Sequence, residues 1–550
     1  MEPIALPSIK SLYDDRTIFI TGASGFLGKV LIEKMLYSLP GIRRIYILIR
    51  ASRGKSGAER WRAFENLVLF NRVRRDCPDR LEKIVAVEGD ITLPDLGMAE
   101  ADVTRILDET SMVFHCAATV RFDEPLKRAV ELNMKGVSRV ISICYRMPKL
   151  ECFLHCSSCY ANADKPGILV EEKIYQPPPC DPHKLLETED VLDDSEFDRI
   201  EQEAVMAFGN TYCFTKCLAE HLVMEEAASL PALIFRPSII GAVLRDGIPG
   251  WADKLQGLGA MITAFGTGAM SRIPVDLEAR VDAVPVDVVS AAMTVCGAYR
   301  LASKERWSIP IVHCGTSSLN PIIYKECRSA ALECAYKYPL ARILSTPMFS
   351  NHGSDSLERW MHQMRARFLG PLLDALLTLA GQKPFFTRLY GRLGGAYSIF
   401  KKFISDYTFE SENIVQILGM MTAEDKEIFQ IDVRKIDIIE FGCTTWMGVK
   451  VFFMKDDIDN MSIRRARKNL KLIQLKDFVL TVIVCSLCTL LLTGSTTSWH
   501  VLIPLVIIAH FYFNVQPFKA QGILSIRDYQ SRIENAMGAT LKSMKDEKRI

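Results

Sequence analysis

A tyrosine and a lysine stand four residues apart in Tyr212-Cys213-Phe214-Thr215-Lys216. On a helix this spacing places a phenol and an ammonium on one face, one turn apart. The cation stabilises a phenolate, so we expect it to lower the pKa of Tyr212 from about 10 toward the operating pH, as a proton donor to a carbonyl requires. The pair alone is weak evidence, because tyrosine and lysine at this spacing occur on many ordinary helices.

Two adjacent serines follow a predicted strand. The apolar run 151–155 leads into Cys156-Ser157-Ser158-Cys159, and a hydroxyl at a strand end can face a cleft and hydrogen-bond a substrate oxygen. The sequence leaves open which serine does so, because successive strand residues point to opposite faces. The two cysteines have metal-ligand or redox spacing, but no second pair at finger-like spacing accompanies them. We interpret them as buried thiols and expect no metal site.

A glycine-rich turn near the start of the chain predicts a nucleotide site. The apolar run 17–20 leads into a turn and then into a helical pattern. A side chain at Gly22 or Gly25 would keep the backbone away from a pyrophosphate, and Gly28 lets the helix approach the strand. The helix N-terminus offers free N–H groups to phosphates. The expected cofactor contacts come from Thr21, Gly22, Ser24, Gly25, Phe26, Leu27 and Gly28.

The end of the second predicted strand indicates the kind of dinucleotide. Strand 44–49 ends in Arg50, about where an acidic residue would hold the ribose of NAD. A guanidinium suits a 2′-phosphate instead, and Arg53 and Lys55 follow closely, so NADPH is favoured over NADH. A solvated basic loop is the alternative, because arginine and lysine are common at protein surfaces.

Strands alternate with helical patterns along the first half of the chain. Further apolar runs, 83–88 and 111–116, end in Gly89-Asp90-Ile91 and Ala117-Ala118. This order predicts an α/β fold with a doubly wound parallel Rossmann sheet. Beyond residue 310 the sequence is helical and aromatic. Its apolar segment 368–380 is too short to span a bilayer, and an interfacial helix and an ordinary core helix are both open for it.

Two apolar runs near the carboxyl end, 478–492 and 501–515, are joined by a short polar link. Each is slightly short for the ~20 residues of a full span, so we expect either two thin spans or a hairpin that enters one leaflet. Basic residues precede the first run and follow the second, which places both ends and the folded part in the cytosol. We therefore predict a membrane anchor over 478–515 and a cytosolic tail over 519–550.

The composition excludes several classes of protein. The 550 residues include 67 Lys and Arg against 65 Asp and Glu, so nucleic acid is not indicated as a partner. The first six residues lack a basic region followed by a long apolar run, and no secretory signal is visible. We therefore interpret the 16 cysteines as reduced cytosolic thiols. The oligomeric state is not encoded in any motif.

Together these motifs resemble the extended short-chain dehydrogenase/reductases, in which the glycine turn, Gly89-Asp90-Ile91, Asn133-x-x-Gly136, the serine pair and Tyr212-x-x-x-Lys216 occur in this order. Within that superfamily the chain is most similar to the fatty acyl-CoA reductases, through Pro249-Gly250-Trp251, Val284-Pro285-Val286-Asp287 and Phe409-Glu410-Ser411-Glu412-Asn413. The resemblance covers residues 10 to 455. It implies an NADP-binding catalytic domain at 10–305 and a mostly helical carboxy-terminal reductase domain at 310–457.

The resemblance implies roles for individual residues. Ser158, which we choose of the two serines, and Tyr212 would hold the carbonyl oxygen. Lys216 would bind the nicotinamide ribose and tune Tyr212. The residues expected along the adenine are Asp90 and Ile91, and the residue expected to support the active-site backbone or a water path is Asn133.

The implied substrate is a long-chain fatty acyl-CoA, reduced with two NADPH. The first hydride transfer gives a hemithioacetal that expels coenzyme A and leaves an aldehyde; the second, with a proton from Tyr212, gives the primary alcohol. Segment 368–380 would then be an interfacial helix or part of an acyl-chain tunnel. Such reductases are peroxisomal or endoplasmic-reticulum membrane proteins, and we expect the peroxisomal membrane, with wax-ester or ether-lipid synthesis downstream.

Two other functions stay open. A membrane-bound hydroxysteroid dehydrogenase-like enzyme would share the serine, tyrosine, lysine and apolar tail, although Arg50 and the long carboxy-terminal match argue against it. A non-catalytic NADP-binding scaffold would have no need of a proton donor and its cation.

Overall fold

The computed structural model describes residues 5–52, 54–176, 178–188, 194–255, 257–270, 276–303, 305, 308–347, 364–391, 405–493 and 523–538. Within these residues the largest sheet has seven strands in the order β11-β7-β5-β4-β1-β2-β3, and every neighbouring pair is parallel. The strands are β1 (Thr17–Thr21), β2 (Arg44–Ile49), β3 (Ile84–Glu88), β4 (Met112–His115), β5 (Cys152–Cys156), β7 (Ala232–Pro237) and β11 (Ile311–Cys314). The predicted doubly wound parallel sheet is confirmed.

The strand order reverses between β1 and β4, and this is the point at which such sheets bind their ligands. The seventh strand, β11, lies beyond residue 305, the predicted end of the first domain, and pairs with β7. The sheet therefore continues into residues that the sequence assigned to the carboxy-terminal domain.

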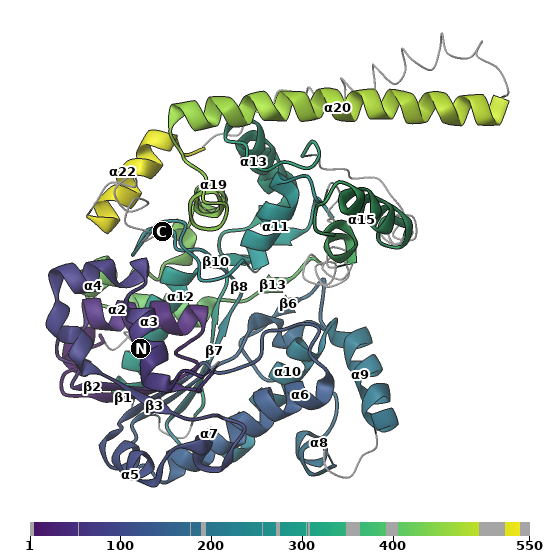
Figure 1. Ribbon diagram of the computed structural model, residues 1–550. Helices are drawn as coiled ribbons and strands as arrows, with labels where there is room; N and C mark the ends of the chain where they lie inside the picture. The colour runs from purple at the N-terminus through teal and green to yellow at the C-terminus, as the bar shows by residue number, and fades with distance from the viewer. Residues whose placement is uncertain are drawn as a thin grey trace.

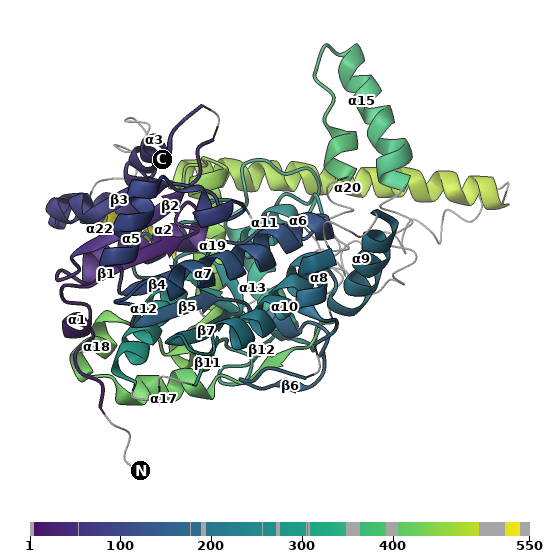
Figure 2. The same ribbon diagram turned by 90° about the horizontal axis from the view of Figure 1, so that it is seen from below.

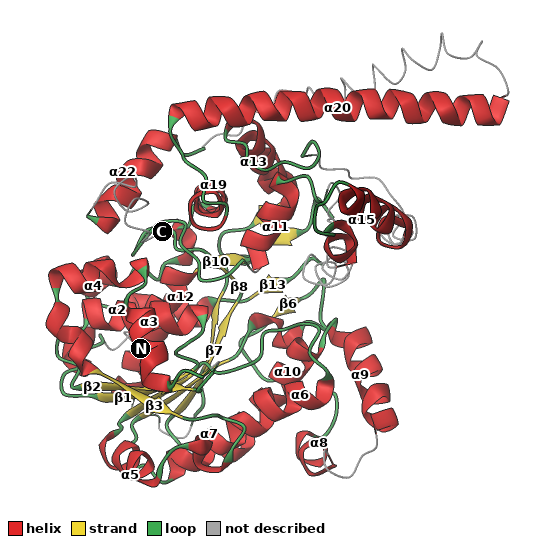
Figure 3. Ribbon diagram, in the orientation of Figure 1, coloured by secondary structure: helices red, strands yellow, loops and turns green. Residues whose placement is uncertain are grey.

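Helices cover both faces of the sheet (Figure 3). Alternation along β1 shows the reason: Ile18 and Ile20 belong to one hydrophobic cluster and Phe19 to another, because successive strand residues point to opposite faces. Helices that contribute to the cluster of Ile18 include α1 (Ile9–Leu12), α2 (Phe26–Ser38), α3 (Gly57–Glu65), α4 (Asn71–Asp76) and α12 (Val286–Ala302). Those that contribute to the cluster of Phe19 are α5 (Glu100–Glu109), α7 (Gly136–Tyr145) and α10 (Thr211–Glu226).

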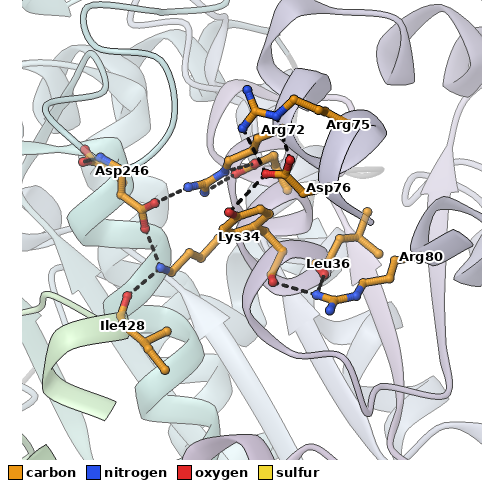
Figure 4. A network of polar contacts seen from close by, with 11 residues as sticks. Lys34, Leu36, Arg72, Arg75, Asp76, Arg80, Asp246 and Ile428 are labelled. Atoms are coloured by element: carbon orange, nitrogen blue, oxygen red, sulfur yellow. Dashed lines mark hydrogen bonds and ion pairs between the residues drawn. The ribbon is translucent and has the colours of Figure 1, made fainter. Parts of the chain in front are cut away.

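A polar network fixes α2 against its neighbours (Figure 4). Lys34 of α2 donates to the carbonyl of Ile428, 2.7 Å away, and pairs with Asp246. Arg72 of α4 pairs with the same aspartate and with Glu33, whose side chain is 1% exposed. These contacts join the helix that follows the glycine turn to segments more than 170 and nearly 400 residues later in the chain.

Further helices and short strand pairs lie beyond the carboxyl ends of the strands (Figure 1). These helices are α11 (Gly257–Gly266), α13 (Tyr324–Lys337) and α19 (Ile438–Gly448), and beside α10 lie α6 (Leu126–Val130), α8 (Pro182–Thr188) and α9 (Asp194–Phe208). Two others, α17 (Glu412–Met420) and α18 (Ala423–Ile428), lie near α1, where the N–H of Ile9 donates to Asp425 of α18 at 3.1 Å (Figure 2). The short pairs join β8 (Ile239–Gly241) to β10 (Ala283–Pro285), β9 (Arg280–Val281) to β12 (Ile322–Ile323), and β6 (Leu169–Val170) to β13 (Thr408–Phe409).

Helix α15 (Gly370–Leu379) covers most of the apolar segment 368–380 and projects from the body beside α20 (Figure 2). Its leucines face water: Leu372 is 59% exposed, Leu376 55% and Leu379 85%. The interpretation of this segment as an ordinary core helix is therefore wrong, because the surface that a core helix would bury is open.

The longest helix, α20 (Asn460–Thr493), has a basic first half and carries the first apolar run in its second half. Among the described residues, no helix combines the length and the apolarity that crossing a membrane requires. The second run, 501–515, and most of the polar link lie outside the described residues. The membrane hairpin thus stays a prediction.

Part of the predicted tail is packed into the main hydrophobic core. Residues Ile526–Met537 form α22, in which Tyr529 and Ile533 are fully buried. The hydroxyl of Tyr529 donates to the carbonyl of Pro249 at 3.0 Å. The chain therefore returns to the body after α20.

Candidate active site

The glycine turn lies at the reversal of strand order, between β1 and the end of β4. Gly22 has a φ of +75°, and a Cβ on it would lie 2.5 Å from the carbonyl carbon of Cys116. A Cβ on Gly28 would lie 2.4 Å from the carbonyl oxygen of Gly22. Gly25 is exposed and precedes α2 without a capping side chain, so the first N–H groups of α2 remain available to an anion. The turn fits a dinucleotide pyrophosphate.

The other predicted residues of the turn are held in place. Thr21 is buried, and its Oγ1 is 2.7 Å from Nδ1 of His115 at the end of β4. Ser24, Phe26 and Leu27 are half-buried, so each keeps some surface at the mouth of the turn.

Arg50 stands at the end of β2 with its side chain 55% exposed, and its guanidinium lies 3.6 Å from the carboxylate of Asp90. Arg60 of α3 donates to the backbone carbonyl of Arg50, and burial together with the charge of Arg50 lowers the pKa of Arg60. Lys55 lines a hollow next to this pair. Arg53 lies outside the described residues.

Sequence reasoning missed Arg60. The available signal was the capping box of Ser56 and Glu59, in which the serine hydroxyl accepts from the Glu59 N–H and the Glu59 carboxylate accepts from the Ser56 N–H. The capping box fixes the start of α3 at Gly57. Arg60 then lies in the first turn of α3, from which it reaches the end of β2.

The two residues expected along the adenine differ in their surroundings. Asp90 is half-buried, and its Oδ1 accepts from the N–H and the hydroxyl of Thr92, both at 3.0 Å. Ile91 is 6% exposed and packs its side chain against Gly136. Ile91 therefore presents little side-chain surface to a ligand.

Tyr212 and Ser158 come together at the carboxyl end of β5. Asn210 caps α10 by accepting from the N–H of Cys213 at 2.8 Å, which sets Tyr212 in the first turn of the helix. The hydroxyl of Ser158 lies near that of Tyr212 and acts to lower the pKa of the phenol. The neighbouring Ser157 is buried, and its hydroxyl has no hydrogen-bond partner within the described part of the chain. The structure thus brings Ser158, and not Ser157, to the tyrosine.

Lys216 lies one turn further along α10 and is buried. Its ammonium donates to the carbonyl of Cys156 at 2.7 Å, and burial lowers its pKa. The expected lowering of the Tyr212 pKa by Lys216 is wrong for this structure. Burial raises the pKa of Tyr212 well above its ordinary value, and this effect outweighs the lowering caused by the nearby Ser158. Tyr212 is therefore protonated at neutral pH, as a proton donor must be.

Asn133 fastens two segments of the site. It lies in a π-helical turn, Glu131–Lys135, and is fully buried. Its Oδ1 accepts from the N–H of Thr119 at 2.8 Å, and its Nδ2 donates to Thr215 Oγ1 at 3.1 Å. It joins the loop after β4 to α10 between Tyr212 and Lys216, in agreement with the predicted support of the active-site backbone.

The histidines near the site, His115 and His155, are buried and uncharged. His115 and His155 stack with their ring centroids 5.5 Å apart, and burial lowers the pKa of His115 to about 3. Cys156 and Cys159 are buried free thiols. Over the residues that the structure describes, no three histidine, cysteine or acidic side chains form a metal-binding group.

The parallel sheet, the glycine turn and the neighbouring hydroxyls of Ser158 and Tyr212 define a nicotinamide-dependent oxidoreductase with a Rossmann fold. Two family models described as male sterility protein match residues 20–293 and 366–456. Fatty acyl-CoA reductase 1 of Rattus norvegicus is 34% identical over 463 residues, which cover 84% of this chain and 89% of the relative. Fatty acyl-CoA reductase 2 of Homo sapiens is 32% identical over 467 residues, covering 85% and 90%.

This chain belongs to the fatty acyl-CoA reductase family. Among solved structures, the terminal R domain of the myxalamid PKS-NRPS pathway is similar with a TM-score of 0.55 and 20% identity, over 81% of this chain and 92% of that one. The reductase domain of a non-ribosomal peptide synthetase from Mycobacterium tuberculosis has a TM-score of 0.51 and 16% identity, over 82% and 94%. At these identities the two structures establish the fold.

Proposed function

We propose that this protein reduces long-chain fatty acyl-CoA to a primary fatty alcohol with NADPH and releases coenzyme A. One observation carries the proposal. Ser158 follows the carboxyl end of β5 and lies near Tyr212 in the first turn of α10, in a chain that matches fatty acyl-CoA reductases over 84% of its length.

The side chains of the site account for both halves of the reaction. A bound nicotinamide supplies hydride to the carbonyl carbon. Ser158 and Tyr212 donate hydrogen bonds to the carbonyl oxygen and stabilise the negative charge that develops on it. Collapse of the resulting hemithioacetal expels coenzyme A and leaves an aldehyde. In the second half, Tyr212 gives its proton to the alkoxide oxygen, and its raised pKa keeps that proton in place until the oxygen becomes basic.

The choice of NADPH is supported by the cations at the end of β2. Arg50 is exposed and paired only loosely, at 3.6 Å, with Asp90. Arg60 and Lys55 add positive charge around it. A guanidinium binds phosphate oxygens with charge-assisted hydrogen bonds. The 2′-phosphate of NADPH would therefore bind to the cations at the end of β2.

We also propose that the protein is attached to a membrane through α15 and the apolar end of α20. The segment that follows α15 folds back onto it, because the carboxylate of Asp374 in α15 accepts from the N–H groups of Phe385, Phe386 and Thr387 at 2.7 to 2.9 Å. Phe385 is 52% exposed, and leucines of α15 are exposed to a similar or greater degree. A contiguous apolar surface of this kind is suited to a lipid interface. We place the protein in the peroxisomal membrane, with the endoplasmic reticulum as the alternative, the catalytic part in the cytosol, and ether-lipid or wax synthesis downstream.

The test is an assay of the detergent-solubilised full chain with palmitoyl-CoA, in parallel with NADPH and NADH. Fatty alcohol with two NADPH consumed for each coenzyme A released is expected. Aldehyde at one NADPH for each coenzyme A would place the second reduction elsewhere. No turnover with any chain length, while NADPH still binds, would favour the hydroxysteroid dehydrogenase-like enzyme or the non-catalytic scaffold.

Tyr212→Phe separates catalysis from binding in the same assay. The variant loses the proton donor and keeps the ring, which packs edge-on against Phe122 with ring centroids 5.8 Å apart. We expect kcat to fall by about 10²–10⁴-fold while NADPH binding is unchanged. Phe122→Leu, which alters the same packing and leaves the phenol, is the matched control. Turnover of Tyr212→Phe close to that of the wild type would refute the assigned role.

A further inference from the structure

An apolar cavity of about 110 Å³ lies between α11, α13 and α19. Its wall includes Met261, Ala283, Tyr324, Ala331, Gly442 and Trp446. Three wall residues carry an O–H or N–H group in the side chain: Tyr324, Arg328 and Trp446. The indole N–H of Trp446 already donates to the carbonyl of Tyr338 at 2.9 Å. The cavity therefore offers an alkyl group apolar contact and few competing hydrogen-bond partners.

Two short connections lead from the candidate active site to this cavity. Ser158 donates to the carbonyl of Pro237 at 3.5 Å, and the next residue, Ser238, donates to the carbonyl of Asp282 at 2.8 Å. Asp282 is followed by Ala283, a wall residue that pairs with Ile239 across β8 and β10. The wall residue Ala283 is thus the cross-strand partner of Ile239, which follows Pro237, the residue that contacts Ser158, by two positions.

The second connection runs through aromatic rings. Tyr160 lies two residues after Ser158 and is buried, and its pKa is raised by burial first and then by the nearby Tyr324. Tyr324 is itself part of the cavity wall. Ile239 and Ile240 of β8, which follow Ser238, and Met261 of α11, which is part of the cavity wall, are half-buried apolar residues. An alkyl chain that runs from Ser158 to the cavity can pass over them.

The size of the cavity identifies which part of a chain it takes. At about 110 Å³ it is somewhat smaller than the ~150 Å³ cavity that binds a benzene molecule. It is too small for a whole long acyl chain and large enough for the last few carbons. The remaining methylenes would lie between the cavity and Ser158.

We propose that this cavity binds the methyl end of the acyl chain while the thioester lies at Ser158 and Tyr212, so that it selects for chain length. The inference rests on the proposed function and adds the site that recognises the lipid part of the substrate.

Gly442 provides the means to test it. It lies inside α19, lines the cavity, and has no atom within 4 Å of the position that a Cβ would take. A larger residue there occupies open space and also favours the helix. Gly419, inside α17, likewise has no atom within 4 Å of an added Cβ and is not part of the cavity wall. Gly419→Phe is therefore the matched control for Gly442→Phe.

The experiment compares kcat/KM for palmitoyl-CoA and octanoyl-CoA in the full-length wild type and both variants. We expect Gly442→Phe to lower kcat/KM for palmitoyl-CoA by about tenfold or more, mainly through KM, because several methylenes lose their burial. Activity with octanoyl-CoA should stay within about twofold, as should both activities of Gly419→Phe. An unchanged ratio in folded Gly442→Phe, or an equal fall for both substrates, would overturn the inference. A wild type that reduces neither substrate would overturn the proposed function instead.

Two further measurements keep the inference testable if Gly442→Phe does not fold. Ala331→Phe narrows the cavity from α13 and is expected to give the same change in chain-length preference. A direct readout without NADPH uses the fluorescence of Trp446, which a bromine atom quenches on contact. Palmitoyl-CoA brominated at its last carbon should quench more than palmitoyl-CoA brominated at carbon 2, and Trp446→Phe should remove the difference. Equal quenching by the two ligands would contradict the placement of the methyl end.

Discussion

At the scale of single residues, we expect cofactor choice to depend on the cations at the end of β2. Arg50 is exposed, and Asp90, at 3.6 Å, is a weak partner for it. We predict that Arg50→Ser lowers the preference for NADPH over NADH about tenfold, because a hydrogen bond to a charged group contributes ~1.5–3 kcal/mol. The measurement is kcat/KM for the two cofactors at fixed palmitoyl-CoA.

Arg146→Ser is the matched control for Arg50→Ser, because Arg146 is also a partly exposed arginine paired with an aspartate, Asp95, away from the glycine turn. Its cofactor preference should equal that of the wild type. If Arg50→Ser weakens NADPH and NADH to the same degree, Arg50 does not contact the 2′-phosphate.

Glu172 gives the site a pH dependence in the stability of the fold. Its carboxylate accepts from the N–H of His313 at 2.7 Å and of Asn413 at 2.8 Å, which joins β11 to the start of α17. Burial raises its pKa to about 7. Between the unfolded value of about 4.5 and pH 7, the folded protein holds a proton that the unfolded chain has released. This group therefore makes the free energy of unfolding fall as the pH rises through that window, by up to ~3 kcal/mol.

We predict that Glu172→Gln flattens the decline in stability between pH 5 and pH 7.5. The measurement is the midpoint of urea unfolding at several pH values within this range. Glu171→Gln, which alters an adjacent carboxylate with a side chain 47% exposed, should leave the slope of the wild type unchanged. The same slope in Glu172→Gln and the wild type would exclude Glu172 as its source.

Sequence reasoning reached the residues whose role depends on local spacing. The glycine turn, the serine pair, Tyr212 and Arg50 can be located from a strand end or from one helical turn, while the choice of Ser158 within the pair came from the family resemblance and the roles of these residues stay predictions. It missed the rise in the Tyr212 pKa, because burial depends on the packing of distant segments around α10. It also missed Arg60, whose contact with Arg50 needs the path of the loop between β2 and α3.

At the scale of elements, helix α2 depends on a buried ion network for its position. Arg72 pairs with Glu33 and Asp246, and Glu33 is 1% exposed (Figure 4). We predict that Arg72→Met destabilises the fold by about 3–5 kcal/mol, because removal of one partner leaves a buried charge uncompensated. The measurement is urea unfolding, followed together with NADPH binding, which α2 supports.

Arg75→Met is the matched control on the same helix. Arg75 pairs with Asp76 at the surface, with side-chain exposures of 47% and 34%, and exposed pairs contribute ~0–1 kcal/mol. Equal losses of stability in Arg72→Met and Arg75→Met would mean that burial of the ion network does not account for its contribution to the free energy of unfolding.

The elements of the sheet were predictable because parallel strands covered on both faces give continuous apolar runs. The predicted run 44–49 coincides with β2, and 83–88 differs from β3 by one residue. The short run Ile311–Cys314, which forms β11, follows a long helix, and its pairing with β7 is visible only in three dimensions because the two strands lie far apart in the sequence. The cavity wall, which gathers residues from 258 to 446, has no counterpart in local sequence spacing.

At the scale of the whole molecule, α22 restricts how the chain can meet a membrane. Tyr529 and Ile533 are fully buried in the main core, and Arg532 pairs with Glu440 of α19. Residues on both sides of the apolar runs are thus attached to one folded body. If the chain entered a bilayer at the apolar end of α20, it would have to return to the side on which it entered before reaching α22. A single membrane span is incompatible with this packing.

The last prediction follows from that restriction. In cells with a selectively permeabilised plasma membrane and intact organelles, antibody should reach a tag at the amino terminus and a tag at the carboxyl terminus equally. A luminal tag on a resident organelle protein, which should stay protected, is the control. Protection of the carboxy-terminal tag alone would mean that one run crosses the membrane. In that case α22 would be separated from Pro249 and Glu440, and the variant Tyr529→Ala, which removes a fully buried side chain, would lose little stability instead of the ~3–5 kcal/mol expected for a buried aromatic residue.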